Sequence, residues 1–158
     1  MTTATIKVPI GELIDKIIIL RLKVEKLGRS ADGGQLNHYL SELVAEYKSL
    51  SIDRNNLTPL CVTLRRVNAI LWRLEDKIRQ HEKDAAFDSA FVCTARLIAR
   101  LNDRRAAIKK QINDLAGSAF YDVKYYEIPP SEPRARSRDR ATTPTYTLLH
   151  ASNKGREP

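Results

Sequence analysis

The stretch from residue 59 to residue 116 constrains the fold most, because it carries two long helical repeats separated by a short break. In the first arm, apolar residues recur at alternating spacings of four and three. They are Leu60, Leu64, Val67, Leu71, Leu74 and Ile78. This spacing is typical of a helix packed lengthwise along another helix, as in a coiled coil. The pattern therefore predicts a long antiparallel helical hairpin that folds back about residue 85.

The second arm repeats this seam with two polar interruptions. Its members are Phe87, Phe91, Thr94, Ile98, Leu101, Arg105, Ile108, Ile112 and Leu115. Thr94 and Arg105 weaken packing at seam positions, but polar residues there can fix the register of two helices. With a fold about residue 85, Asn68 lies level with Asn102. The middle of the hairpin is therefore expected to gather polar side chains.

The flanks of the two seams, together with the seam residue Arg105, carry the candidate site, since residues three and four apart on a helix are neighbours. The candidate residues are Asn68, Trp72, Glu75, Asp76, Arg79, Arg96, Asn102, Asp103, Arg105 and Lys109. One interpretation is a solvated, salt-bridged flank that sets the register. The other is a cleft in which Arg and Lys bind a small anion while Glu75 and Asp76 orient them. Arginine suits such a cleft, because its planar guanidinium group matches a carboxylate or a phosphate.

Two further helices are predicted before the hairpin. The first runs from Pro9 to about Leu27 and is apolar on more than one side, so we expect it to pack on more than one side. Glu12 and Asp15 lie in its first turns, where negative charge suits the helix dipole. A turn of small polar residues follows at 28–34, and the second helix covers about 35–50.

The ends of the hairpin helices also have sequence signals. Thr58 followed by Pro59 predicts the start of the third helix. Asp84 is the expected N-terminal cap of the fourth helix, with Asp88 as the alternative if the break is longer. Gly117 is the expected stop.

Composition agrees with an all-α antiparallel bundle of about four helices. The chain has 158 residues, 6% aromatic residues and only six glycines. Cys61 and Cys93 lie in helical patterns without metal spacing, and we expect buried free thiols. Glu42 and Glu46 lie one turn apart, but they do not form the two fixed acidic pairs of a helical metal site. We therefore predict no metal and no cofactor.

The chain changes character near residue 129, which divides it into a helical domain (1–128) and a Pro/Arg-rich tail (129–158). Residues 119–128 are rich in aromatic residues and predict an extended arm. The tail holds six Arg or Lys and three acids, which gives +3 of the net +8, and we expect it to be disordered. The N-terminus lacks the apolar core of a signal peptide, and no apolar run is longer than four residues, as at 17–20. We expect a cytoplasmic protein without a membrane span.

Several blocks in order resemble a small all-helical bacterial family of unknown function, over about residues 6–128. They are VPIGELIDKIIIL, VNAILWRLEDKIRQHE and FDSAFVCTARLIARLNDRRAAIKKQIN, followed by VKYYEI. The resemblance implies no activity and no catalytic residue. It implies only that relatives are sometimes encoded near cell-surface polysaccharide and glycosyltransfer genes. The chain departs from the family pattern at Arg21, where an acidic residue is expected.

Three functions follow from these observations. The first is a non-enzymatic interaction or adaptor module, with a protein partner or a homodimer, serving envelope-polysaccharide or glycosyltransfer machinery. The second is a small enzyme or sensor that binds an anionic metabolite between the third and fourth helices. The third is nucleic-acid binding through the basic tail, which would depend steeply on salt. No nucleophile or phosphate-loop motif is present, so the sequence favours the non-enzymatic function.

Overall fold

Four helices form the part of the chain that the computed structural model describes, which is residues 6–28 and 31–120. They are α1 (Ile10–Leu27), α2 (Ala31–Ser49), α3 (Arg54–Lys83) and α4 (Ser89–Ala116). No strand occurs in these two ranges. The all-α class and the long hairpin, α3–α4, are therefore confirmed. The predicted tail, and the expected arm beyond Phe120, lie outside the described residues.

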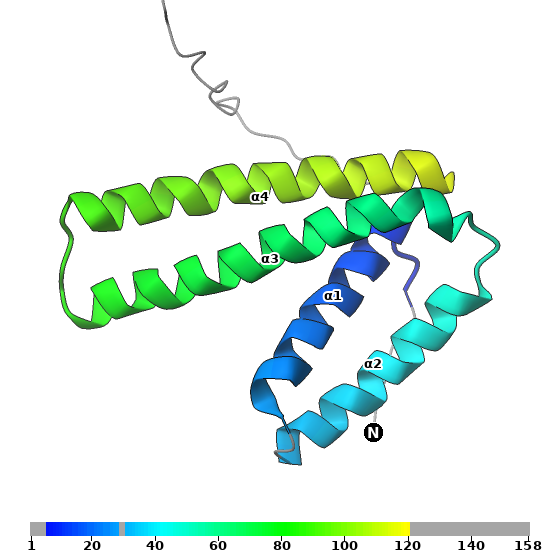
Figure 1. Ribbon diagram of the computed structural model, residues 1–158, viewed down its shortest axis with the longest axis horizontal. Helices are drawn as coiled ribbons and strands as arrows, with labels where there is room; N and C mark the ends of the chain where they lie inside the picture. The colour runs from blue at the N-terminus through cyan, green and yellow to red at the C-terminus, as the bar shows by residue number, and fades with distance from the viewer. Residues whose placement is uncertain (1–5, 29–30, 121–158) are drawn as a thin grey trace, which may run out of the picture.

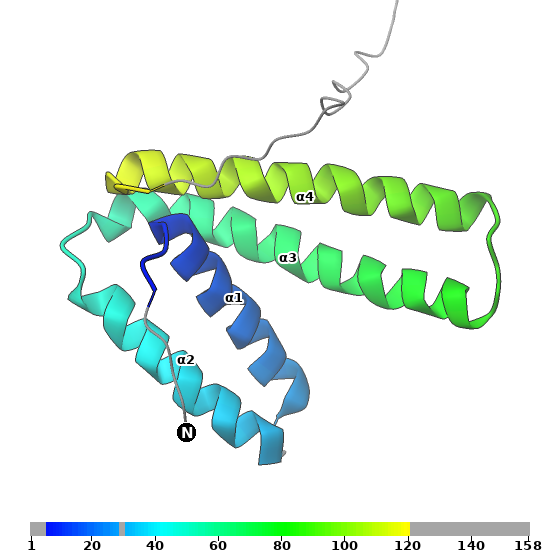
Figure 2. The same ribbon diagram turned by 180° about the vertical axis from the view of Figure 1, so that it is seen from behind.

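The hairpin and the N-terminal helices form two unequal parts, as Figure 1 shows. Helices α3 and α4 run antiparallel along the whole length of the structure. Helices α1 and α2 form a shorter antiparallel pair near the open end of the hairpin. Helix α1 lies against both α3 and α4, whereas α2 packs mainly on α1 and meets α3 where Arg54 donates hydrogen bonds to the Tyr47 and Lys48 carbonyls (Figures 1 and 2). The closed end of the hairpin extends beyond this pair.

One core joins α1 to the hairpin. Its buried members are Ile14, Ile18, Leu22, Leu57, Leu64, Val67, Leu71, Ile108 and Ile112. Leu64 and Ile112 are fully buried. Leu13, Ile17 and Leu20 are buried as well, outside this cluster. Helix α1 is therefore packed on more than one side, as its apolar residues predicted.

The start of α3 differs from the prediction. The helix begins at Arg54, and the carboxylate of Asp53 accepts a hydrogen bond from the backbone N–H of Asn55 at 3.0 Å. Asp53 caps the first turn in the manner of an aspartate at this position. Pro59 lies inside the helix rather than at its first position, because this earlier cap starts the helix. Helix α2 also begins earlier than predicted, at Ala31.

The ends of α4 follow the sequence signals more closely. Asp88 is the N-terminal cap and accepts hydrogen bonds from the backbone N–H groups of Ala90 (2.9 Å) and Phe91 (3.0 Å). Asp84, the first choice from sequence, instead follows the end of α3. Gly117 ends α4 with a left-handed backbone (φ 61°), as predicted.

The two cysteines are less buried than predicted. The prediction that both thiols are buried is wrong for Cys93, which is exposed, whereas Cys61 is half-buried. His38 is exposed, whereas His81 is half-buried and stacks edge-on against Phe91. Within the two described ranges, no helix combines the length and the apolar character that crossing a membrane requires.

Candidate functional site

The carboxylate of Asp15 joins three helices. Asp15 on α1 is 2% exposed and accepts a hydrogen bond from Asn68 Nδ2 on α3 at 2.7 Å. Arg105 on α4 donates from Nε to both carboxylate oxygens, at 3.1 and 3.2 Å, and from its Nη2 atom to Oδ2. A buried charge requires a partner and hydrogen bonds of this kind. The cluster therefore fixes how α1 sits on the hairpin, and it holds the Arg105 guanidinium in one orientation.

A second set of contacts lies one turn away along α1 and α4. Lys109 Nζ pairs with the carboxylate of Glu12, and Asn113 Oδ1 accepts a hydrogen bond from the Gly11 N–H at 2.6 Å. The two helices approach so closely here that a Cβ atom on Gly11 would lie 2.6 Å from the Lys109 carbonyl oxygen. Glycine is therefore required at this crossing.

The sequence interpretation of Glu12 and Asp15 as helix-dipole residues missed these pairs. A signal was available, because the two acids are three residues apart on α1 and two basic residues, Arg105 and Lys109, are four residues apart on α4. Each set lies on one face of its helix. What the sequence did not indicate was that these two faces meet.

A hollow of about 330 Å³ lies beside the buried cluster, between α1, α3 and α4. It is lined by Ile19, Leu22, Lys23, Asn68, Leu71, Trp72, Glu75, Arg79 and Arg105. The structure therefore brings five of the ten candidate residues together around one space. Lys23 was not among the candidates, because it lies on α1 rather than on the hairpin.

Three cations, Lys23, Arg79 and Arg105, and one acid, Glu75, line the hollow, while Asp15 and Asp76 pair with Arg105 and Arg79 from outside the lining. Burial acts to lower the pKa of Arg105, but its hydrogen bonds and the charge of Asp15, with Glu12 and Glu75, raise the pKa above the usual value. Arg105 therefore stays charged over the whole working pH range.

Trp72 and its neighbours form the rim of the hollow. The ammonium group of Lys26 lies 4.7 Å from the centroid of the half-buried Trp72 ring and 3.7 Å from Asp76 Oδ2. Arg79 lies 3.3 Å from Asp76 and 3.8 Å from Glu75. Glu75 and Asp76 therefore pair with Arg79 along α3, an arrangement that both the salt-bridged flank and the cleft interpretation expect.

The other candidate residues do not line the hollow. Lys109 pairs with Glu12, and Asn102 Nδ2 donates to the Ile98 carbonyl at 3.2 Å. Arg96 is exposed on α4 and Asp103 is half-buried there. The polar residues predicted as one cleft between α3 and α4 are thus divided, and the hollow needs α1 as its third wall.

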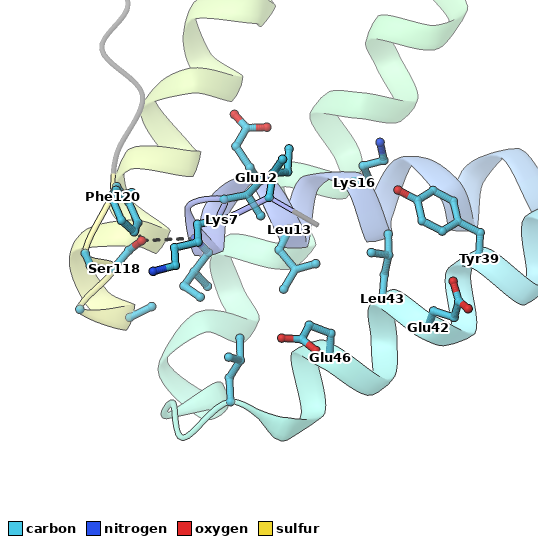
Figure 3. Close-up of a pocket in the computed structure, with 17 residues that line it drawn as sticks. Lys7, Glu12, Leu13, Lys16, Tyr39, Glu42, Leu43, Glu46, Ser118 and Phe120 are labelled. Atoms are coloured by element: carbon cyan, nitrogen blue, oxygen red, sulfur yellow. Dashed lines mark hydrogen bonds between the residues drawn. The ribbon is translucent and has the colours of Figure 1, made fainter. Parts of the chain in front are cut away.

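A larger groove of about 940 Å³ lies on the other side of α1, between α1, α2 and the chain segments next to Ile10 and Ala116 (Figure 3). Leu13 and Leu43 line it, with Glu46 of α2 and Lys7 among the charged residues along it. Ser118 Oγ accepts a hydrogen bond from the Ile10 N–H at 3.4 Å near one end. Across the described ranges, no group of three or more His, Cys, Asp or Glu side chains is placed to hold a metal ion.

The fold and these contacts define a small four-helix domain in which a long hairpin and an N-terminal helix share a buried ion pair and a cationic hollow. The chain belongs to the family of unknown function DUF6165, whose family model matches residues 5–142. This match extends past residue 128, where the resemblance to the sequence blocks ended. No curated protein and no solved structure matches the chain.

Proposed function

We propose that this chain binds a small anionic molecule in the hollow between α1, α3 and α4, as a sensor or ligand-carrying module. The observation that carries this proposal is Arg105. Its guanidinium is held by a buried carboxylate and also lines an open space of ligand size. An arginine fixed in advance loses little conformational freedom when it binds an anion.

The other lining groups supply what such a ligand needs. Lys23 is exposed on α1, and none of the described acids lies within ion-pair distance of it. Trp72 offers an aromatic ring at the rim, and Leu22 and Leu71 form an apolar base. The arrangement fits a carboxylate or phosphate attached to a small apolar or ring-shaped group.

A thermal-shift screen of the full chain tests the proposal, with sugar phosphates, nucleotides, nucleotide sugars and dicarboxylates as probes. A ligand at 100 times its Kd should stabilise the fold by about 2.7 kcal/mol. Lys23→Ala and Arg79→Ala should reduce the effect. Lys16→Ala and Arg73→Ala are the matched controls, because they remove exposed cations of the same helices outside the hollow.

Arg105→Ala is unsuitable as the test variant, although its position at the seam first suggests it. It would leave Asp15 buried without its cationic partner, so the loss of binding and the loss of folding could not be separated. A screen in which every probe gives the same shift in the wild type and in Lys23→Ala would contradict the proposal.

A second candidate is the non-enzymatic interaction module. The observation in its favour is the closed end of the hairpin, which extends beyond α1 and α2 and carries Phe87, Val92 and Leu97 with 58%, 51% and 36% of their surface exposed. A place beside envelope-polysaccharide or glycosyltransfer machinery would be one setting for such a module. The test is whether a partner protein, once identified, loses affinity when these apolar residues are replaced by Ser. Retained affinity would count against the module.

A further inference from the structure

The hairpin has a second basic face, turned away from α1. By helical spacing its residues lie about 100–160° around α3 from Trp72 and about 120–180° around α4 from Lys109, both of which face α1. We call this the rear face. Its cations are Arg66, Arg73, Lys77, Arg96, Arg100 and Arg104, and all six are exposed. No described acid lies within ion-pair distance of any of them.

The register of the hairpin places these cations close together. Asn68 and Arg105 bind the same carboxylate, and the rings of His81 and Phe91 are 6.2 Å apart, so residue numbers on opposite arms sum to about 172. The six cations therefore lie within about 16 Å along the hairpin axis. Ile70 and Leu97, exposed at 40% and 36%, lie among them. The rear face thus combines an apolar strip with cations on its flanks.

The face of the hairpin that contacts α1 shows which kinds of side chain can bind to a surface of this composition. Helix α1 lies there with its apolar residues Ile14, Ile18 and Leu22 in the core. Three of its acids pair with basic residues of the hairpin, as Glu12 with Lys109, Asp15 with Arg105 and Glu25 with Arg65. The hairpin therefore already binds one amphipathic helix through apolar contacts and acid–base pairs.

We infer that the rear face docks an acidic amphipathic helix of a partner protein. Its cations would pair with Asp or Glu of that helix, and Ile70 and Leu97 would contact the apolar stripe. A nucleic-acid backbone would meet the cations but offer nothing apolar to Ile70 and Leu97. This inference deepens the interaction-module candidate, on which it rests, and does not depend on the hollow.

The exposed thiol of Cys93 supplies a probe, because it lies one helical turn from Leu97. A fluorophore on Cys93 of the full chain, in a Cys61→Ala background, is titrated with a synthetic helix bearing Glu beside a Leu stripe. We expect saturable binding, with at least tenfold weaker binding of the same helix bearing Lys. Arg100→Glu/Arg104→Glu and, separately, Ile70→Asp should each weaken binding at least tenfold.

Two controls keep the outcome specific. Arg21→Glu/Lys48→Glu gives the same change in net charge on α1 and α2, and it should leave binding unchanged. Lys23→Ala should also leave binding unchanged, so failure of the hollow and failure of the rear face can be told apart.

Three results would overturn the inference. The first is no response to the Glu helix at about 1 mM, the weak end of specific affinity. The second is tighter binding of a DNA duplex that Ile70→Asp does not alter, which would assign the face to nucleic acid. The third is self-association of the unlabelled chain that Arg100→Glu/Arg104→Glu abolishes, which would assign the face to a second copy.

Discussion

The two halves of the α3–α4 hairpin share one seam pattern but differ in burial. In the inner half, residues 54–71 and 102–116, five residues of α3 and three of α4 are buried, and α1 covers them. In the outer half, residues 72–83 and 89–101, only Thr94 is buried. Leu74, Ile78 and Ile98 occupy the same seam but stay half-exposed.

The difference shows that a seam pattern indicates which face of a helix contacts a partner helix. Full burial of the seam side chains also requires a third packed layer. Two helices alone cover only part of each seam side chain, and α1 completes the cover over the inner half alone (Figure 2). The hollow lies at the boundary, since Asn68 and Arg105 belong to the inner half while Glu75 and Arg79 belong to the outer half. A ligand there would contact both halves.

The largest expected effect is a difference in unfolding free energy between two arginine variants, one in each half of the hairpin. Arg105→Ala leaves Asp15 buried and unpaired, which should cost about 3–5 kcal/mol of unfolding free energy. Arg96→Ala in the exposed outer half should change it by about 0.5 kcal/mol or less. Urea denaturation of both variants measures the difference. Equal, small costs would mean that the Asp15 cluster does not hold α1 in place.

Seam leucines and isoleucines give the next comparison. Leu64→Ala removes a fully buried side chain of the inner half, and we expect a loss of about 2–5 kcal/mol. Ile78→Ala removes a half-exposed one of the outer half, and about 1–2 kcal/mol is expected because only part of its surface is buried. If Ile78→Ala costs as much as Leu64→Ala, a partner or a second copy covers the outer half in solution.

Glycine substitutions test the close contact between α1 and α4, which covers the inner half of the hairpin. Gly11→Ala would place a Cβ 2.6 Å from the Lys109 carbonyl oxygen and 2.9 Å from Asn113 Oδ1, so α1 and α4 must separate. The expected loss is about 1–3 kcal/mol. Gly34→Ala in α2 meets nothing within 4 Å and should stabilise the protein by about 0.5–1 kcal/mol. Thermal unfolding measures both variants, and a Gly11→Ala protein as stable as the wild type would contradict the close crossing.

The smallest effect concerns the cap at the start of the outer half of α4. Hydrogen bonds from the backbone N–H of Phe91 and of Ala90 hold the pKa of Asp88 below its ordinary value of 3.8. Since the folded-state pKa is the lower one, this stabilisation is complete above the unfolded-state pKa and is lost as pH falls through the folded-state pKa. Asp88→Asn should therefore lower the Tm at pH 7 slightly and flatten its fall toward pH 2. If the Tm of both proteins fell equally steeply with decreasing pH, the Asp88 carboxylate would not contribute to the pH dependence of stability.

The hairpin could be predicted from sequence because its seam and its Gly117 stop are local signals, whereas the cap of α4 is Asp88, the alternative to the expected Asp84. The two polar seam residues show where local signals end. Thr94 satisfies its own hydroxyl by donating to the Ala90 carbonyl at 2.8 Å, a contact within one helix. Arg105 is satisfied by Asp15, 90 residues away, and no periodicity indicates that pairing.

The sequence predicted which α3 residues belong to the candidate site, but it did not predict that α1 forms one side of the hollow. The stripe containing Asn68, Trp72, Glu75 and Arg79 follows from helical spacing, and these residues do line the hollow. Lys23 and the role of Asp15 depend on the angle at which α1 crosses the hairpin. That angle is set by the close approach at Gly11 and by burial over the inner half, which the sequence pattern of either element alone does not contain.

Tryptophan fluorescence tests the central claim, the anion site at the boundary of the two halves, most directly. The chain has a single tryptophan, Trp72, at the rim of the hollow, so its emission reports on this site alone. Titration with the best probe from the thermal-shift screen should give a saturable change that Lys23→Ala weakens and Lys16→Ala preserves. An emission spectrum that stays constant while the probe still stabilises the protein would show that the anion binds elsewhere.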